Sequence, residues 1–386
     1  MGCYNTKLQK TGLTSSAYKY GIDTYLDQNL NSQYSENQES DKSIQSLNGG
    51  TRASTAISLS TVDVKSKRSI FKLQKVRELI TLPNGHQNQV KQILKMDQNR
   101  LLSIGNDCQI IIWDMITMTK LYALDTKQSV YLACVIPNRL LIGILGQNRD
   151  KLYAWNIQGQ FKSNATELVD SLKLNRMVKS LINLEFTNNR FFCVGYQTGE
   201  LSIFDNTNME IAEEVQFFQH PLDILVESKE NIKLKSCIIG ASRKSQTIRL
   251  VSYRNNTETI VDVGQIKVRS NVCNLHELRD LNIAVALQNG DVEIWNILKS
   301  NAPQRTLKSF DNIITKVVSL ELGQILMGVT KDARFMFWKI FNGQPILQSD
   351  YPVHTKKVTG VIVHGDKIFT SSHDSSIRAT SLIYKY

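Results

Sequence analysis

Seven short apolar runs recur along this chain at nearly constant intervals, and this recurrence constrains the fold more than any other feature. The runs begin at residues 101, 140, 191, 237, 283, 325 and 368, so successive starts differ by 39, 51, 46, 46, 42 and 43 residues. A polar turn and a second apolar run follow each of them, which is the pattern of a hairpin. An interval near 40–45 residues is typical of a four-stranded propeller blade. The sequence therefore predicts an all-β, seven-bladed β-propeller over residues 69–386.

Residues 1–68 have a different composition. They are rich in Asn, Gln, Ser and Thr, and they contain no Phe, Trp or Pro. Such a segment cannot bury enough apolar surface to offset the entropy lost on ordering. We therefore expect a disordered N-terminal tail over residues 1–68, joined to a folded domain over residues 69–386.

The first repeat contains a complete polar motif, formed by Gly85-His86, Ser103, Asp107 and Trp113-Asp114. In order and spacing these residues resemble a repeat of the WD-repeat propeller family. The resemblance implies that the histidine bonds the serine of the second strand and the aspartate of a tight turn, and that the tryptophan of the third strand closes the chain. A buried carboxylate that several donors satisfy would fix the stacking of the strands.

The other repeats carry parts of this motif. His220 and His354 repeat the histidine, four residues before an expected inner strand, and Asp332 and Asp374 repeat the turn aspartate. The tryptophan position is held by Trp155, Trp295 and Trp338, and is replaced by Phe204, Val251 and Thr380 in the third, fourth and seventh repeats. The last repeat would still contain three of the four residues of the polar network, namely His354, Thr370 and Asp374.

The last repeat lacks an outer strand, because the sequence stops soon after its third apolar segment. A ring of sheets has exposed edges unless its ends are joined. The run at residues 71–80 has the length and β character of the missing strand. We expect it to complete the last blade.

Each candidate catalytic group has a structural explanation. The three histidines and three aspartates named above belong to the predicted network, and His364 and His373 have no cysteine near them in sequence. The chain contains no phosphate-cradling glycine loop, nucleophile elbow or zinc-hydrolase motif. We therefore expect a binding platform for one or more proteins, monomeric by itself, and neither an enzyme nor a holder of a metal or cofactor.

The first seven residues, Met1 to Lys7, match the pattern for N-myristoylation, with Gly2 as acceptor and Thr6 at the hydroxyl position. Cys3 would accept a palmitoyl chain. One myristoyl chain binds membranes only marginally, with a constant on the order of 10⁴ M⁻¹, so a second chain matters. These residues predict a scaffold held at the cytoplasmic face of a membrane.

Three other functions are alternatives to this scaffold, and the sequence favours each of them less. The formal charge of +11 suggests RNA, but the Lys and Arg residues are scattered along the chain. Substrate receptors of ubiquitin ligases usually show Trp-Asp-x-Arg at a blade end, whereas here Trp113-Asp114-Met115 precedes Ile116. G-protein β-subunits begin with a coiled-coil helix, and the tail has no heptad pattern.

The six cysteines form no C-x-x-C pair, which fits a protein of a reducing compartment.

Overall fold

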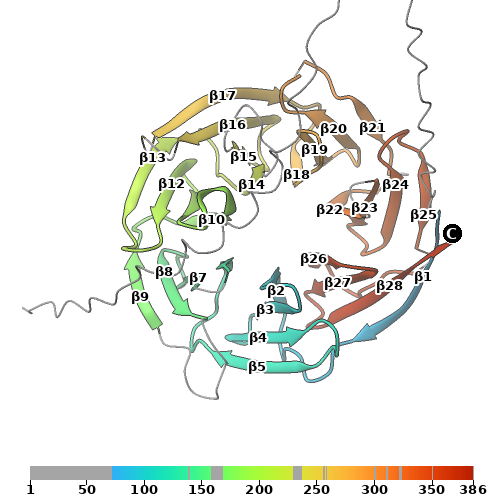
Figure 1. The fold of residues 1–386 in the computed structure, drawn as a ribbon, viewed down its shortest axis with the longest axis horizontal. Coiled ribbons are helices and arrows are strands. Elements are labelled where there is room, and N and C mark those ends of the chain that lie inside the picture. Colours follow the sequence, from blue (N-terminus) through green and yellow to red (C-terminus); the bar gives the residue numbers. More distant parts are fainter. Residues whose placement is uncertain are drawn as a thin grey trace, which may run out of the picture. The chain divides into compact units, whose positions relative to one another are not determined.

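The computed structural model describes residues 72–137, 140–157, 168–228, 237–254, 257, 259–299, 301–309, 312–320, 324–349 and 351–385. The predicted tail at residues 1–68 lies outside them. The described residues form seven four-stranded antiparallel sheets arranged in a ring (Figure 1). The protein is thus an all-β, seven-bladed β-propeller, as the repeats predict.

Blades are numbered from the first complete one, and each is given from its inner to its outer strand. Blade 1 comprises β2 (Val90–Lys95), β3 (Arg100–Gly105), β4 (Gln109–Asp114) and β5 (Lys120–Asp125). Blade 2 comprises β6 (Leu132–Ile136), β7 (Leu140–Leu145), β8 (Lys151–Asn156) and β9 (Leu168–Lys173). Blade 3 comprises β10 (Val178–Leu184), β11 (Phe191–Tyr196), β12 (Glu200–Asp205) and β13 (Ile211–Gln216), with the 3₁₀ turn η1 (Glu185–Thr187) after β10.

The remaining blades follow the same order. Blade 4 comprises β14 (Ile224–Ser228), β15 (Cys237–Ala241), β16 (Thr247–Arg254) and β17 (Thr259–Lys267). Blade 5 comprises β18 (Val272–Glu277), β19 (Asn282–Leu287), β20 (Val292–Asn296) and β21 (Arg305–Leu307). Blade 6 comprises β22 (Ile314–Leu320), β23 (Ile325–Thr330), β24 (Phe335–Lys339) and β25 (Pro345–Gln348). Blade 7 comprises β26 (Val358–His364), β27 (Lys367–Ser372), β28 (Ile377–Lys385) and β1 (Lys72–Thr81).

The ring closes through its first and last strands. β1 pairs antiparallel with β28, from Lys72 opposite Lys385 to Thr81 opposite Arg378. In Figure 1 the blue first strand lies along the red last strand. The prediction that residues 71–80 complete the last blade is confirmed.

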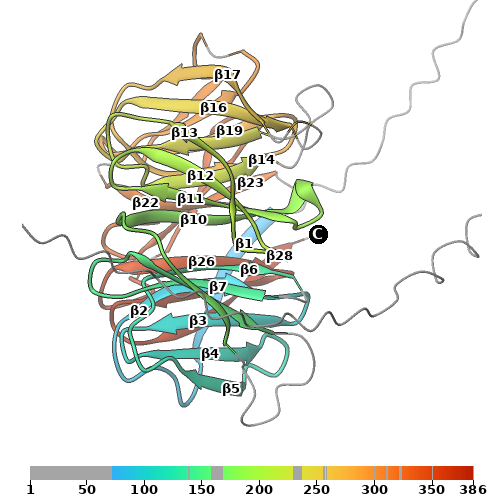
Figure 2. The same ribbon diagram turned by 90° about the vertical axis from the view of Figure 1, so that its left-hand side faces the viewer.

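The core lies between neighbouring blades. The second strands of the blades are almost wholly buried, and in β11 all six residues are buried. Because successive side chains of a strand point to opposite faces of its sheet, such a strand packs against both adjacent blades. Phe191 of blade 3 meets Tyr253 of blade 4 edge to face, with ring centroids 5.3 Å apart. Figure 2 shows the blades stacked in this way.

The strand register supports the predicted replacement of the tryptophan in blade 4. Trp113 pairs with Leu101, and both pack toward blade 7, which precedes blade 1 in the ring. In blade 4, Val251 pairs with Ile238, and both pack toward the preceding blade 3. Val251 therefore holds the tryptophan position of blade 4, as predicted.

Antiparallel pairing gives the ring two distinct faces. The front face is the face at which the chain enters each inner strand, and the rear face is the opposite one. Loops between the second and third strands also lie at the front face. Five blades carry a bulge within the first three residues of the inner strand, at Lys91, Lys179, Cys273, Thr315 and Thr359. A bulge redirects a side chain, and here it does so at the front end of the central channel.

Candidate functional site

The predicted polar network of blade 1 is present in the structure. Trp113 donates from Nε1 to Ser103 Oγ at 2.8 Å, and Ser103 Oγ lies 2.8 Å from His86 Nε2. His86 Nδ1 lies 2.9 Å from Asp107 Oδ1. Burial lowers the pKa of His86, so the imidazole is neutral, with Nδ1 donating to Asp107 and Nε2 accepting from Ser103. One chain of bonds thus joins the front loop to the second and third strands.

Blade 7 contains the three predicted members. His354 Nδ1 lies 3.0 Å from Asp374 Oδ2, and His354 Nε2 lies 2.8 Å from Thr370 Oγ1. Burial opposes ionisation of Asp374, but hydrogen bonds from Ser376 and the adjacent imidazole hold the pKa of this carboxyl well below its usual range. Thr380, at the tryptophan position, is fully buried, and its hydroxyl has no hydrogen-bond partner in the described structure.

His220 does not join a network, contrary to the prediction. Its side chain is exposed, and the buried Leu222 fills the loop instead. In blade 4, Gly240 stands where blade 1 has Ser103, and the side chains of Phe217 and Leu222 lie against it, so a buried imidazole would lack its hydroxyl partner.

Blade 6 keeps two motif positions in altered form. Asp332 is exposed and accepts from Asn312 Nδ2 at 2.8 Å. Trp338 is fully buried but donates to the backbone carbonyl of Lys308 at 3.1 Å. The reason is Gly328, which replaces the serine and leaves no hydroxyl to accept from the indole. Neither residue reproduces the blade 1 network.

Gly105 is a network position that sequence reasoning missed. A Cβ atom built there would collide with the ring of His86 and the carboxylate of Asp107. Glycine is therefore needed where the histidine crosses the end of β3. The sequence contained one signal for this role, since Gly105 stands two residues before the turn aspartate Asp107.

The histidines, cysteines and acidic residues outside the networks are dispersed over the described part of the chain. No group of three or more His, Cys, Asp or Glu side chains in the described part of the chain is arranged to hold a metal ion. His364 ends β26 at the rear face, whereas His373 follows β27 at the front face. The five cysteines within the described ranges are free thiols: Cys108, Cys134, Cys193, Cys237 and Cys273. In those ranges no helix is long and apolar enough to cross a membrane.

The central channel holds the most distinctive site. A cavity of about 980 Å³ runs between the inner strands. At its front end the lining includes seven basic side chains, which we call the basic mouth: Lys91, Arg149, Lys179, Arg243, Lys316, Lys331 and Lys357. They come from six of the seven blades and lie at the start of inner strands or in the loops after second strands.

Little negative charge opposes the basic mouth. Among the described lining residues only Asp223 and Glu185 are acidic, and Glu185 lies in η1 at the rear end. Asp223 accepts a hydrogen bond from the backbone nitrogen of Arg243 at 3.0 Å. Within the described chain, no carboxylate forms an ion pair with any of the seven side chains. The front end of the channel is therefore strongly positive.

Tyr131 anchors two of these cations. Its ring lies 4.0 Å from Lys91 Nζ and 4.6 Å from the guanidinium carbon of Arg149. Lys91 also donates to Ser129 Oγ at 2.5 Å. Burial, together with the charge of Arg149, lowers the pKa of Lys91 to about 8. The aromatic ring holds both cations in place but supplies no negative charge.

Lys316 is a half-buried cation of the mouth. Burial, aided by the charges of Arg243 and Lys357, lowers its pKa to about 8. Burial and the charges of Lys357, Lys356 and Lys91 likewise lower the pKa of His373. Repulsion thus links cations of blades 4, 6, 7 and 1 around the channel.

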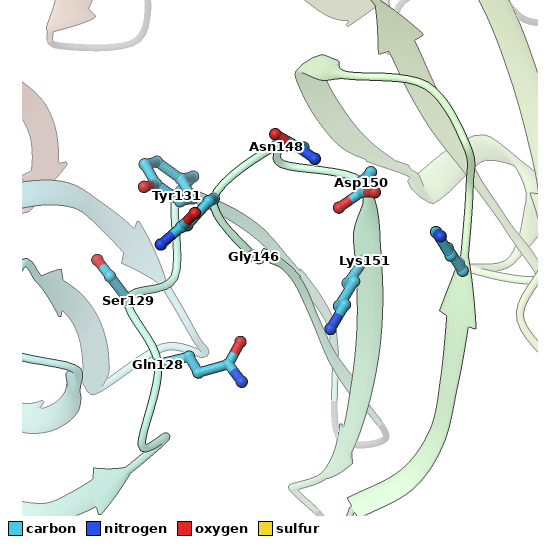
Figure 3. A pocket seen from close by; sticks show the side chains of 9 residues that line it. Gln128, Ser129, Tyr131, Gly146, Asn148, Asp150 and Lys151 are labelled. Carbon is cyan, nitrogen blue, oxygen red and sulfur yellow. The ribbon is translucent and has the colours of Figure 1, made fainter.

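A second, smaller cavity opens beside the mouth, between blades 1 and 2. It measures about 560 Å³ and shares Tyr131 with the channel. Figure 3 shows Gln128, Ser129 and Tyr131 on the segment that leads into β6, across from Asn148 and Asp150. Its lining combines amide and hydroxyl groups with the charged side chains of Asp150, Lys151 and Lys173.

The predicted acylation sites, Gly2 and Cys3, lie outside the described residues. Comparison with known proteins adds no identity: no protein-family model matches this sequence, and no curated protein matches it.

Proposed function

We propose that this protein is a non-catalytic interaction platform of the WD-repeat type. Its front face binds an acidic partner, and acyl chains on Gly2 and Cys3 hold it at the cytoplasmic face of a membrane. The basic mouth carries the proposal, because seven cations converge there without ion pairs among the described residues. A β-propeller commonly serves as a scaffold for protein interactions, and the blade 1 network supports the WD-repeat resemblance.

Electrostatics gives the front face a preference among partners. A cleft lined by one sign of charge raises the local concentration of oppositely charged ligands and speeds their association. An acidic surface would therefore be steered toward the mouth, and salt would weaken the steering. The closed ring presents this charge on rigid strand ends, so little ordering entropy is lost on binding.

The membrane part rests on the N-terminal residues alone. A single myristoyl chain gives reversible attachment, with a constant on the order of 10⁴ M⁻¹, and a second chain makes it stable. Cys3 beside Gly2 supplies the position for that second chain.

The test compares the wild type with Gly2→Ala and Cys3→Ser in cells. Fractionation should show the wild type with membranes, Gly2→Ala in the soluble fraction, and Cys3→Ser divided between them. Affinity capture from the same cells reports the partners of each form. An unchanged membrane fraction for Gly2→Ala would refute the tether and leave the front-face proposal standing.

The front face is tested by charge reversal. Arg243→Glu should abolish capture of partners, whereas Lys95→Glu, an exposed residue at the rear end of β2, should leave it intact. Equal effects of the two substitutions would contradict a front-face docking surface.

The mouth also favours a second candidate, an RNA-associated propeller. RNA binding that depends on phosphate contacts falls steeply with salt. Absent or salt-insensitive binding of a single-stranded oligonucleotide would remove this candidate.

A further inference from the structure

Several positions at the front end of the channel carry basic side chains that the fold does not require. Lys331 and His373 follow the second strands of blades 6 and 7, and each donates its backbone nitrogen to a residue before the inner strand. Asn106 and Gln288 hold the same position in blades 1 and 5 and make the same bond. Likewise Cys273 holds in blade 5 the bulge position that Lys91 holds in blade 1. Neutral side chains therefore satisfy the fold at these sites.

Keeping cations at these positions is unfavourable for the free protein. Removing a charge from water without a partner costs free energy, and a neighbouring like charge adds to that cost. Lys316 meets both conditions, since it is largely removed from water beside Arg243 and Lys357. A bound anion would offset this free-energy cost, because it would pair with several cations at once.

The arrangement of the charges indicates the shape of that anion. Cations of six blades surround one axis, so a compact ligand on the axis would face all of them, whereas an extended chain crossing the face would leave some unpaired. The cavity of about 980 Å³ is large for a single ion. It lies at the upper end of the range of about 300–1,000 Å³ that small-molecule sites occupy.

The amount of charge indicates phosphate. Seven cations and the single front-face carboxylate of Asp223 leave an excess of six positive charges. A phosphomonoester carries about −1.5 to −2 near pH 7, so three or four of them balance this excess. Carboxylates would have to number about six within the same space. Lysine ammonium groups and the forked guanidinium groups of Arg149 and Arg243 both suit phosphate oxygens.

We propose that the basic mouth binds a compact ligand with three or more phosphate groups, either a free polyphosphorylated small molecule or the headgroup of a phosphorylated lipid. This rests on the proposed function for the role of the front face and names the chemistry bound there. The phosphates lie on the channel axis, against Lys91, Arg243, Lys316 and Lys357. Tyr131 keeps Lys91 and Arg149 facing the axis before the ligand arrives.

The first experiment measures binding of inositol hexakisphosphate to the full-length chain by calorimetry. The wild type should bind it at least about 100-fold more tightly than inorganic phosphate, because several sites are engaged together. Lys316→Gln should weaken binding about tenfold, and Arg243→Gln with Lys357→Gln about 100-fold. Each variant is first shown by thermal unfolding to be folded.

Lys91 and Lys95 supply a matched pair of substitutions on one strand. Lys91→Gln should weaken binding about tenfold. Lys95→Gln should change it less than about twofold, because Lys95 also lines the channel but lies at its rear end, away from the basic mouth. Equal losses for the two, or wild-type binding no tighter than for inorganic phosphate, would overturn the proposal.

Vesicles separate the two sources of phosphate. The full-length Gly2→Ala variant is used, so that acylation plays no part. Capture by phosphatidylcholine vesicles containing phosphatidylinositol bisphosphate or trisphosphate, but not by vesicles of equal charge made with phosphatidylserine, assigns a lipid headgroup. Binding of the soluble probe alone assigns a free ligand. A single-stranded RNA or a doubly phosphorylated peptide could instead bind more tightly than inositol hexakisphosphate and lose this binding in Lys316→Gln. That result would overturn the proposal of a compact ligand and indicate a polymer.

Discussion

The interior of blade 1 and the basic mouth differ in whether a charged side chain has partners inside the protein. In blade 1 the carboxylate of Asp107 accepts from His86 and from the backbone of Gln87 at 2.9 Å. In the mouth, Lys316 faces other cations. The contrast separates two uses of charge. Charge with internal partners stabilises the ring, and charge without them is available to a ligand.

Removal of the paired charge should have the largest effect. Asp107→Ala should lower the free energy of unfolding by about 3 kcal/mol, because the donors of His86 and Gln87 lose their acceptor in a largely buried site. Denaturant unfolding measures the loss. Asp332→Ala is the matched control, a turn aspartate whose side chain is 47% exposed, and should cost less than about 1 kcal/mol. A loss below about 0.5 kcal/mol for Asp107→Ala would mean that the network does not stabilise blade 1.

Removal of the unpaired charge should have the opposite sign. Lys316→Met should raise the free energy of unfolding at pH 7, without ligand, by about 1.5 kcal/mol, because an apolar chain replaces a desolvated cation that Arg243 and Lys357 repel. Lys95→Met should leave it unchanged. Destabilisation by Lys316→Met would show that the charge has a partner within the protein.

Removal of a buried hydroxyl that has no hydrogen-bond partner should change the free energy of unfolding by a smaller amount. The hydroxyl of Thr380 is fully buried without a hydrogen-bond partner in the described structure. Thr380→Val keeps the shape and removes the hydroxyl, so it should stabilise the protein by about 1 kcal/mol in thermal or denaturant unfolding. Thr370→Val should instead destabilise, since that hydroxyl bonds His354. Similar results for the two would mean that Thr380 has found a donor or acceptor.

The smallest effect concerns pH. Lys316 has a folded pKa of about 8 against an ordinary value of 10.5, so between these values the unfolded chain binds more protons and stability rises with pH. Between pH 7 and 8.5 the rise from this group should be about 0.8 kcal/mol. The difference between wild type and Lys316→Met isolates it from other groups. A difference that is constant over this range would contradict the lowered pKa.

Much of the fold could be predicted because each blade repeats one local pattern. Apolar second strands at regular intervals located all seven blades, and the charged but β-rich run at residues 71–80 located the closing strand. His220 shows the limit of this reasoning. Its spacing matched that of His86, but a buried imidazole also needs a hydrogen-bonding partner on the second strand, and blade 4 has Gly240 where blade 1 has Ser103.

The basic mouth could not be found from local sequence, because its residues are scattered along the chain. Lys91 and Lys357 are 266 positions apart, and only closure of the ring brings them to one channel. Aligning the repeats on their inner strands would have exposed the pattern, since the cations recur near equivalent positions. The bulges that redirect Lys91 and Lys179 depend on strand pairing and left no signal in the residues themselves.

The pairing of β1 with β28 also sets the order in which the protein can be completed. About 300 residues separate the two strands, so at roughly 5–20 residues per second β1 waits about 15–60 s during synthesis for its partner. Until then it is an open edge that could pair with another chain. Its sequence carries Lys72, Lys75, Arg77 and Glu78, and charged residues on an edge disfavour such pairing. We expect these charges to disfavour pairing of the unfinished chain with another chain until the ring can close.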